Sequence, residues 1–214
     1  MNDIIIDFKN KCNNWDKYTT QEVVFNASLE TIDISKVKYI LVGDNPGKNE
    51  KVKKKYLIGT TGVIVRCFFE KFLVDDFDKE VVILNKTPIS TNKTKELEDL
   101  KDKKILEVSQ LYMANLIYKI SSKYNIPVII MGISSCRGAS GIWNLNSKAK
   151  KSYFCCFFKQ IKYKFREKKD KLFFIKHFSR NSFFADFDIE DYKKNPKDKF
   201  YNIGINYREE FFKI

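Results

Sequence analysis

The chain has 214 residues, of which 43% are hydrophobic and 15% aromatic, and its formal net charge is +13 at pH 7. This composition excludes a mainly disordered chain, and the length favours a single domain over residues 1–214, with room for one core. No stretch approaches the roughly 20 uninterrupted apolar residues of a membrane helix, so we expect no membrane partner.

The N-terminal segment and the cysteines favour an intracellular protein. Acidic residues lie where a secretion signal carries basic ones, in the segment Met1-Asn2-Asp3-Ile4-Ile5-Ile6-Asp7. The five cysteines include no C-x-x-C pair, and an odd number fits a disulfide framework poorly. We therefore predict a cytoplasmic, bacterial-type monomer with reduced, mostly buried thiols.

Four short apolar runs, rich in β-branched and aromatic residues, predict strands that are buried on both faces: residues 37–42, 81–84, 128–131 and 172–175. Two segments with 3.6-residue periodicity predict helices, at residues 62–74 and 104–123. This alternation implies right-handed crossovers and a three-layer α/β/α sandwich with a central, mainly parallel four-stranded sheet. In such sheets, ligands bind beyond the carboxyl ends of the strands, so the residues that follow each strand are the candidates for a site.

The excess of 40 Lys and Arg over 27 Asp and Glu gives a positive field that attracts polyanions such as DNA or RNA. Lys, Asn, Ile and Phe are all abundant, as in chains from AT-rich genomes, and this bias alone can supply part of the charge. Residues 147–171 interleave basic and aromatic side chains, a pattern that can track a phosphate backbone. For most of these residues the pattern favours an amphipathic helix or edge strand with its lysines in solvent.

The first predicted strand leads into Gly43-Asp44-Asn45-Pro46-Gly47, a tight polar loop whose backbone amides suit a flat or anionic ligand. The turn Gly59-Thr60-Thr61-Gly62 then opens the first predicted helix. The chain lacks the Gly-Lys-Ser/Thr of a P-loop and the G-x-G-x-x-G of a dinucleotide fold, which makes ATP or dinucleotide binding a minor alternative.

Polar residues also follow the second and fourth predicted strands. Asn85 is a turn-former in its simplest interpretation, but its amide matches the alternating edge of a pyrimidine. His177 is the only histidine, and although a lone histidine is more often structural, this one precedes Phe178-Ser179-Arg180-Asn181 on the predicted ligand face. Neither zinc-type ligand spacing nor a G-x-S-x-G elbow is present, so we expect no metal, no other cofactor and no Ser-His-Asp hydrolase.

In chain order, the motifs G-D-N-P-G, N-K-T-P and H-F-S-R-N resemble those of the uracil-DNA glycosylase superfamily, closest in style to its G-M-N-P-G, G-I-N-P-G and G-E-A-P-G branches. They span residues 43–181, about two thirds of the chain. The resemblance implies that superfamily's fold and a monofunctional glycosylase of base-excision repair. Such an enzyme flips a deaminated base, with uracil as the leading candidate, out of DNA and hydrolyses its N-glycosidic bond. The partner would then be damaged DNA, with the protein on the nucleoid while it is bound.

The resemblance also implies a role for each site residue. Asp44 and Asn45 are alternative water-positioning residues, and the choice between them stays open, although only a carboxylate can also stabilise oxocarbenium-like charge. His177, the third catalytic candidate, would donate a hydrogen bond to the departing base. The base pocket would contain Asn85, which reads the base, Tyr56, which stacks on it, and the loop residues Gly43 and Pro46.

The DNA contacts implied by the resemblance are Gly47, Ser179, Arg180 and Asn181. Ser179 would hold a phosphate, and Arg180 would pair with a phosphate or fill the gap left by the extruded nucleotide.

The chain departs from the superfamily pattern at Phe178, where proline is usual, and at Leu57, where phenylalanine is expected. It also lacks the paired cysteines of the iron-sulfur branches, so we expect no cluster. These departures keep open a second function, a DNA-binding module with weak or no catalysis. A third possibility is a small-nucleotide hydrolase or transferase that holds phosphate in the loop of residues 43–47.

Overall fold

The computed structural model describes residues 1–137, 143–145, 153–179, 182–187 and 189–213. Within them, four parallel strands form one sheet in the order β2-β1-β3-β4, with β1 at Tyr39–Gly43, β2 at Val81–Asn85, β3 at Val128–Met131 and β4 at Leu172–Ile175. The register pairs Gly43 with Asn85 and Met131 with Ile175, so the carboxyl ends of the strands lie along one edge. The predicted parallel sheet is confirmed.

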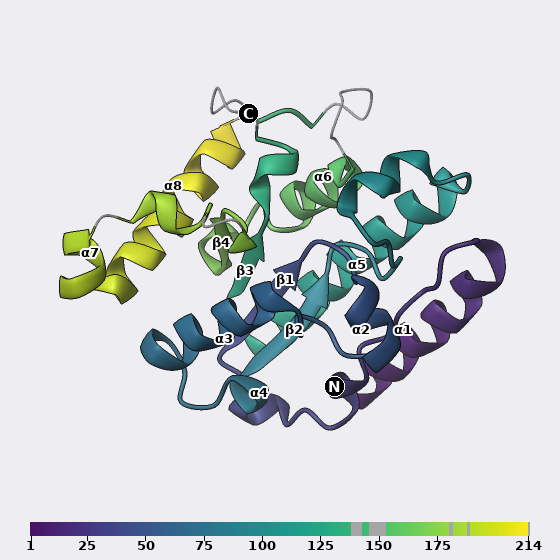
Figure 1. The fold of residues 1–214 in the computed structure, drawn as a ribbon, viewed down its shortest axis with the longest axis horizontal. Coiled ribbons are helices and arrows are strands. Elements are labelled where there is room, and N and C mark those ends of the chain that lie inside the picture. The colour runs from purple at the N-terminus through teal and green to yellow at the C-terminus, as the bar shows by residue number, and fades with distance from the viewer. Residues whose placement is uncertain (138–142, 146–152, 180–181, 188, 214) are drawn as a thin grey trace.

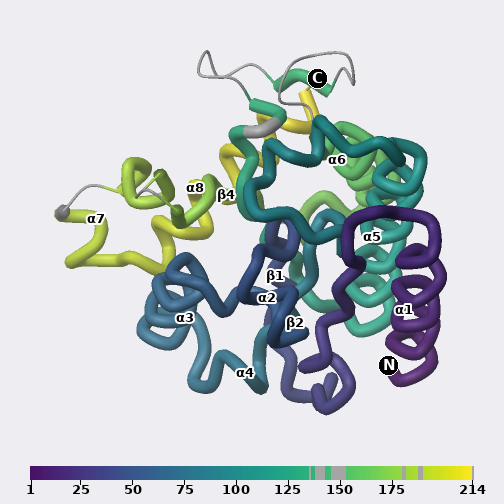
Figure 2. The backbone as a smooth tube through the Cα atoms, turned by 45° about the vertical axis from the view of Figure 1, so that its right-hand side comes forward, coloured from purple at the N-terminus to yellow at the C-terminus, as the bar shows by residue number. Residues whose placement is uncertain are grey.

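Helices cover both faces of this sheet (Figures 1 and 2). The helices are α1 (Asn2–Trp15), α2 (Lys48–Lys53), α3 (Thr60–Phe72), α4 (Phe77–Glu80), α5 (Lys103–Tyr124), α6 (Cys155–Lys164), α7 (Ile189–Lys194) and α8 (Pro196–Lys213). Figure 2 shows α3 and α8 on one side of the sheet and α1, α5 and α6 on the other. The three-layer α/β/α prediction is therefore confirmed.

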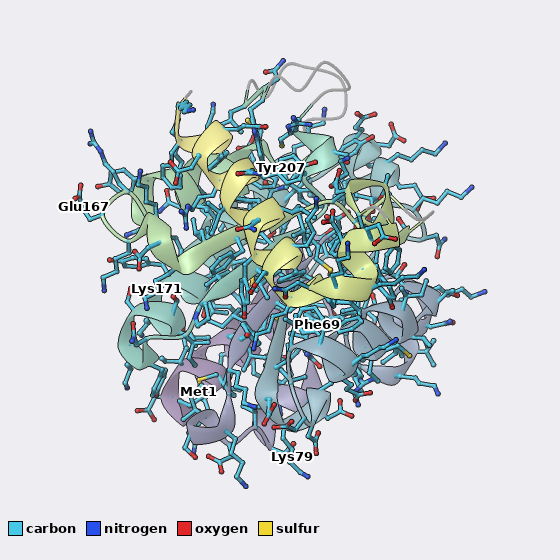
Figure 3. All side chains as sticks on the ribbon, turned by 90° about the vertical axis from the view of Figure 1, so that its left-hand side faces the viewer. Met1, Phe69, Lys79, Glu167, Lys171 and Tyr207 are labelled. Atoms are coloured by element: carbon cyan, nitrogen blue, oxygen red, sulfur yellow. The ribbon has the colours of Figure 1, made fainter. Side chains whose placement is uncertain are left out.

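The helices pack through apolar side chains at helical spacing. Helix α3 buries Val65, Phe68 and Phe69, and the ring of Phe68 lies 5.6 Å from that of Phe200 on α8. Figure 3 views the molecule from the α8 side. Because α3 and α8 share this aromatic contact, they form one continuous layer over the sheet.

The two terminal helices were not predicted from the sequence. On the opposite face, Trp15 of α1 packs edge-on against Tyr112 of α5, with ring centroids 5.2 Å apart. Helix α8 packs directly on β4, where a side chain at Gly204 would lie only 2.9 Å from the Cβ of Phe173. Both helices contain many polar residues, so their apolar stripes are not evident from the sequence.

The basic, aromatic segment contains α6, and the amphipathic-helix interpretation is confirmed for its described part. Phe154, Phe157, Phe158 and Phe165 are fully buried, whereas Tyr163 is 72% exposed. Lys148, Lys150 and Lys151 lie outside the described residues. All five cysteines are free, and Cys12, Cys136 and Cys155 are buried. In the described part of the chain, no helix combines the length and apolar character needed to cross a bilayer.

Candidate active site

A cavity of about 910 Å³ opens at the carboxyl edge of the sheet. Each strand contributes to its wall through its last residues or those just after it: Gly43, Asp44 and Asn45 from β1, Asn85 from β2, Gly132 from β3, and His177 and Ser179 from β4. The turns that begin α2 and α3 supply most of the rest. Motifs far apart in the sequence therefore meet at one site, as expected where parallel strands end together.

Asp44 is held by a lysine that the sequence analysis did not single out. The ammonium of Lys86 donates to Oδ1 of Asp44 and to the carbonyl oxygens of Met131 and Gly132, at 2.6 and 3.1 Å for the two carbonyls. These three acceptors match the three hydrogens of an ammonium group, which explains how Lys86 can be 0% exposed. The side chain of Asp44 is 22% exposed, and its Oδ2 has no hydrogen-bond partner among the described residues.

Gly132 is required for this placement of Asp44. Its φ is +75°, in the left-handed region that favours glycine. A Cβ there would lie 2.5 Å from Oδ1 of Asp44, which is closer than a real contact allows. The carboxylate therefore packs directly against the turn after β3.

Asn45 also lines the cavity, but its amide is bound differently. Its Nδ2 donates to Oγ1 of Thr91 at 2.8 Å, which fixes the side chain against the segment after β2. Its Oδ1 is buried and has no partner within the described chain. Asn45 thus presents an unused acceptor, and Asp44 presents an unused carboxylate oxygen.

Asn85 supplies an unused donor in the same cavity. Asn85 is 4% exposed, and its side-chain Nδ2 is buried without a hydrogen-bond partner among the described residues. Its Oδ1 lies so close to Gly43 that a Cβ at position 43 would be only 2.6 Å away. An unpaired buried donor costs about 1–3 kcal/mol, which a ligand carbonyl can offset by accepting from it.

His177 is a neutral donor in this arrangement. The backbone N–H of Ser179 donates to Nδ1 at 3.1 Å, so Nδ1 carries a lone pair and the ring proton lies on Nε2. The hydroxyl of Ser179 reinforces this tautomer by donating to Nδ1 at 2.7 Å. Burial lowers the pKa of His177 below its ordinary value, while the charge of Asp44 opposes that shift.

Phe178 anchors the loop after β4 in the core. Its ring is fully buried and stacks on Phe183 with centroids 4.0 Å apart, next to Phe68 of α3 at 5.7 Å. The loop is thereby anchored in the aromatic layer while its neighbours His177 and Ser179 line the cavity. Arg180 and Asn181 lie outside the described residues.

Glu50 shapes the loop that carries Asp44. One of its oxygens accepts the backbone N–H of Gly47 at 2.7 Å, and the other accepts the N–H of Leu57. This carboxylate joins the 43–47 loop to the turn before α3. The N–H of Gly47 is occupied in this way, so the predicted DNA contact of Gly47 would have to use other atoms.

Two predicted base-pocket residues do not line the cavity. Tyr56 is fully buried in the core, where its hydroxyl donates to the carbonyl of Val24, so the prediction that it stacks on a base is wrong. The next residue, Leu57, has a left-handed φ of 56° and lines the cavity in place of Tyr56. Pro46 is buried too, and its carbonyl accepts the N–H of Thr91. Among the described residues, the lining contains the tyrosine ring of Tyr153.

The structure adds three lining or supporting residues that motif matching missed. Lys86 could have been found because it directly follows Asn85 at a strand end. Glu50 stands three residues after Gly47, which is the spacing of a capping box. Tyr153 had no such signal, since it reaches the cavity only through the packing of α6.

The rim near α3 favours anions. Helix α3 begins at Thr60, and Gly59 before it provides no side-chain cap. Residues 59–62 all line the cavity. The N–H groups of its first turn have no side-chain cap and therefore suit a negatively charged ligand. Among the residues that the structure describes, no group of three His, Cys, Asp or Glu side chains is arranged to hold a metal ion.

The fold and site together define an α/β/α protein with a cavity at the carboxyl edge of its sheet. The sequence matches no protein-family model and no curated protein.

Proposed function

We propose that this chain is a monofunctional DNA glycosylase that hydrolyses the N-glycosidic bond of a deaminated base, uracil before others. The observation that carries the proposal is the unpaired Nδ2 of Asn85, a buried donor in the cavity that Asp44 and His177 also line. Deamination replaces an amino group of the base by a carbonyl oxygen. An unpaired N–H donates to that carbonyl oxygen, but it disfavours an amino group, which is also a donor.

The remaining side chains fit a hydrolytic mechanism. With the base flipped into the cavity, a water bound to Oδ2 of Asp44 and Oδ1 of Asn45 attacks C1′ of the sugar. The bond from C1′ to the base nitrogen breaks, its electron pair leaves with the base, and the water proton passes to the Asp44 carboxylate. The Nε2–H of His177 donates to the carbonyl on which negative charge develops, a contribution of about 3 kcal/mol.

Three further features support DNA as the substrate. The motif order resembles that of the uracil-DNA glycosylase superfamily, the net charge is +13, and the rim at α3 favours phosphate. In this proposal, Ser179, Arg180 and Asn181 contact the DNA backbone, and the reaction belongs to base-excision repair.

A second candidate is a DNA-binding protein that has lost efficient catalysis. The observation that favours it is the cavity wall at Leu57, where an aliphatic side chain takes the place expected for a stacking aromatic ring. Weaker stacking would leave the flipped base less firmly held.

The test is excision from single- and double-stranded oligonucleotides that contain uracil, hypoxanthine or xanthine, compared with the same strands without them. We expect wild-type protein to leave alkali-labile abasic sites, and Asn85→Ala to lower kcat/KM about 100-fold. Asn92→Ala is the matched control, because Asn92 is an exposed amide on the rim of the same cavity. DNA binding without excision of any of these bases would support the second candidate and exclude the first.

A further inference from the structure

Two lysine-rich segments of the chain differ in how their charges are matched. In residues 51–55, Lys51 and Lys54 pair with Glu22, and Lys55 lies 3.4 Å from Asp78. Residues 159–171 contain seven basic residues and the acids Glu167 and Asp170. Among the described residues of that segment, only Lys169 forms an ion pair, with Glu209.

Two of the unpaired ammonium groups of the second segment lie near the rings of two tyrosines. The ammonium of Lys164 lies 5.7 Å from the ring of Tyr163 and 5.9 Å from the ring of Tyr118, and that of Lys168 lies 6.0 Å from Tyr118. We call Tyr118, Tyr163, Lys164 and Lys168 the α6 basic face. Contact with the rings orders the lysines near one another, and their like charges have no carboxylate among the described residues to neutralise them.

Tyr163 is the unusual member of this face. It is 72% exposed, although every phenylalanine of the surrounding segment from residue 154 to 165 is fully buried. Burying an aromatic ring is favourable, so this exposed ring beside the ammonium of Lys164 leaves a flat apolar surface available to a partner.

The α6 basic face lies away from the cavity. Tyr153, just before α6, lines the cavity, and α6 then runs to Lys164. The following residues, marked by Glu167 and Lys171 in Figure 3, lead into the start of β4. Because the cavity lies at the carboxyl ends of the parallel strands, the start of β4 belongs to the opposite edge. A partner bound there would not compete with a ligand in the cavity.

We propose that the α6 basic face binds a single-stranded segment of nucleic acid. Lys164 and Lys168 contact successive phosphates, and a base stacks on the exposed ring of Tyr163. A duplex keeps its bases stacked on one another and would use only the charges, so the exposed ring favours a single strand. An anionic lipid surface would likewise be attracted by charge without needing the ring at this position.

The experiment measures binding of a fluorescent single-stranded oligonucleotide without deaminated bases, by anisotropy at several salt concentrations. We expect Tyr163→Ala to weaken the affinity about tenfold and Tyr163→Phe to leave it nearly unchanged, because the ring does the stacking. The double variant Lys164→Gln with Lys168→Gln should flatten the slope of log affinity against log salt by about 1.4, the value for two lost phosphate contacts on a single strand.

The matched control is Lys11→Gln with Lys17→Gln, which removes the same charge from exposed lysines in and just after α1. Equal effects of the two double variants would overturn the proposal, because only total charge would then matter. Unchanged affinity in Tyr163→Ala, or a stronger loss of binding to vesicles of anionic phospholipid than to the oligonucleotide, would overturn it too. Since the oligonucleotide contains no excisable base and the readout is binding, the outcome is independent of any glycosylase activity.

Discussion

Asp44 and Glu50 reach the same cavity from neighbouring turns, but their oxygens are occupied differently. Both oxygens of Glu50 accept backbone N–H groups, those of Gly47 and Leu57. Asp44 uses one oxygen for the buried ammonium of Lys86 and has no hydrogen-bond partner for the other within the described chain. A carboxylate whose oxygens are both occupied by backbone shapes the site, whereas one with an unused oxygen can act on a ligand.

Asp44→Asn is expected to have the largest effect. If the unused oxygen of Asp44 holds the attacking water and takes its proton, single-turnover excision should fall about 1,000-fold, because an amide can orient water but cannot accept its proton. DNA affinity should change little, since the substitution leaves the cavity shape intact. Single-turnover excision and anisotropy with the same oligonucleotide measure the two quantities.

The same variant also weakens the counterion of Lys86, so its unfolding by urea must be measured alongside. An Asp44→Asn variant that stays folded and keeps more than a tenth of wild-type activity would show that Asn45 holds the water instead. Asp44 would then have no catalytic role that distinguishes it from Glu50.

Lys86→Met tests the support of Asp44 and should lower the free energy of unfolding by about 3 kcal/mol. The substitution removes the donor that the Asp44 carboxylate and two buried carbonyls share. Because Asp44 is partly exposed, we expect a loss of unfolding free energy at the lower end of the range for a buried ion pair. Urea unfolding measures it. Lys48→Met, at an exposed lysine on the rim of the same cavity, should stay within about 0.5 kcal/mol. Equal stability of the two variants would mean that the ion pair contributes nothing to folding.

The fold could be predicted because its signals are local. The strands that form β1 to β4 are continuous apolar runs, and each was placed within two residues of its observed bounds. Helices α3 and α5 were predicted from their periodicity. Helices α1 and α8 were missed because many polar residues interrupt their apolar stripes, and tertiary packing on α5 and β4 decides their position.

The site could be predicted only where it follows a strand. Asp44, Asn45, Asn85 and His177 were found because parallel strands bring their carboxyl ends together. The prediction that Tyr56 stacks on a base was wrong because its ring is buried in the core, a placement that depends on tertiary packing and that no local sequence pattern indicates. Lys86 was not predicted because a lysine after a strand is usually a surface residue, and its three acceptors come from two segments that are distant in the sequence.

Glu50→Gln should have a smaller effect than either change above, a loss of about 1–2 kcal/mol in the free energy of unfolding. Glutamine has one acceptor oxygen, so either Gly47 or Leu57 would face an amide NH₂ in place of an oxygen. Glu70→Gln is the matched control on the exposed surface of α3 and should change stability by less than about 0.5 kcal/mol. Excision should fall far less than in Asp44→Asn. A loss of excision in Glu50→Gln that matched the loss in Asp44→Asn, without a loss of stability, would show that Glu50 also acts on the substrate.

The smallest expected effect is on the pKa of His177, which responds to the charges of both Asp44 and Glu50. Burial lowers the pKa of His177 from 6.5, and the negative charges of Asp44 and Glu50 oppose the shift, with the larger opposition from Asp44. Removing either charge should therefore lower the pKa of His177 further, and Asp44→Asn should lower it more than Glu50→Gln. Because His177 is the only histidine in the chain, its ring resonances in an NMR titration need no assignment.

The same shift has a consequence for stability with a definite sign. Below pH 6.5 the unfolded chain binds a proton at this histidine while the folded protein does not, so stability falls as the pH drops from 6.5 toward the folded pKa. The slope from this one group cannot exceed about 1.4 kcal/mol per pH unit, and it should vanish in His177→Gln. In Asp44→Asn the window should extend to lower pH than in wild type. A larger fall of the His177 pKa in Glu50→Gln than in Asp44→Asn would contradict this expectation. It would show that the charge of Glu50 affects the histidine more strongly than the charge of Asp44.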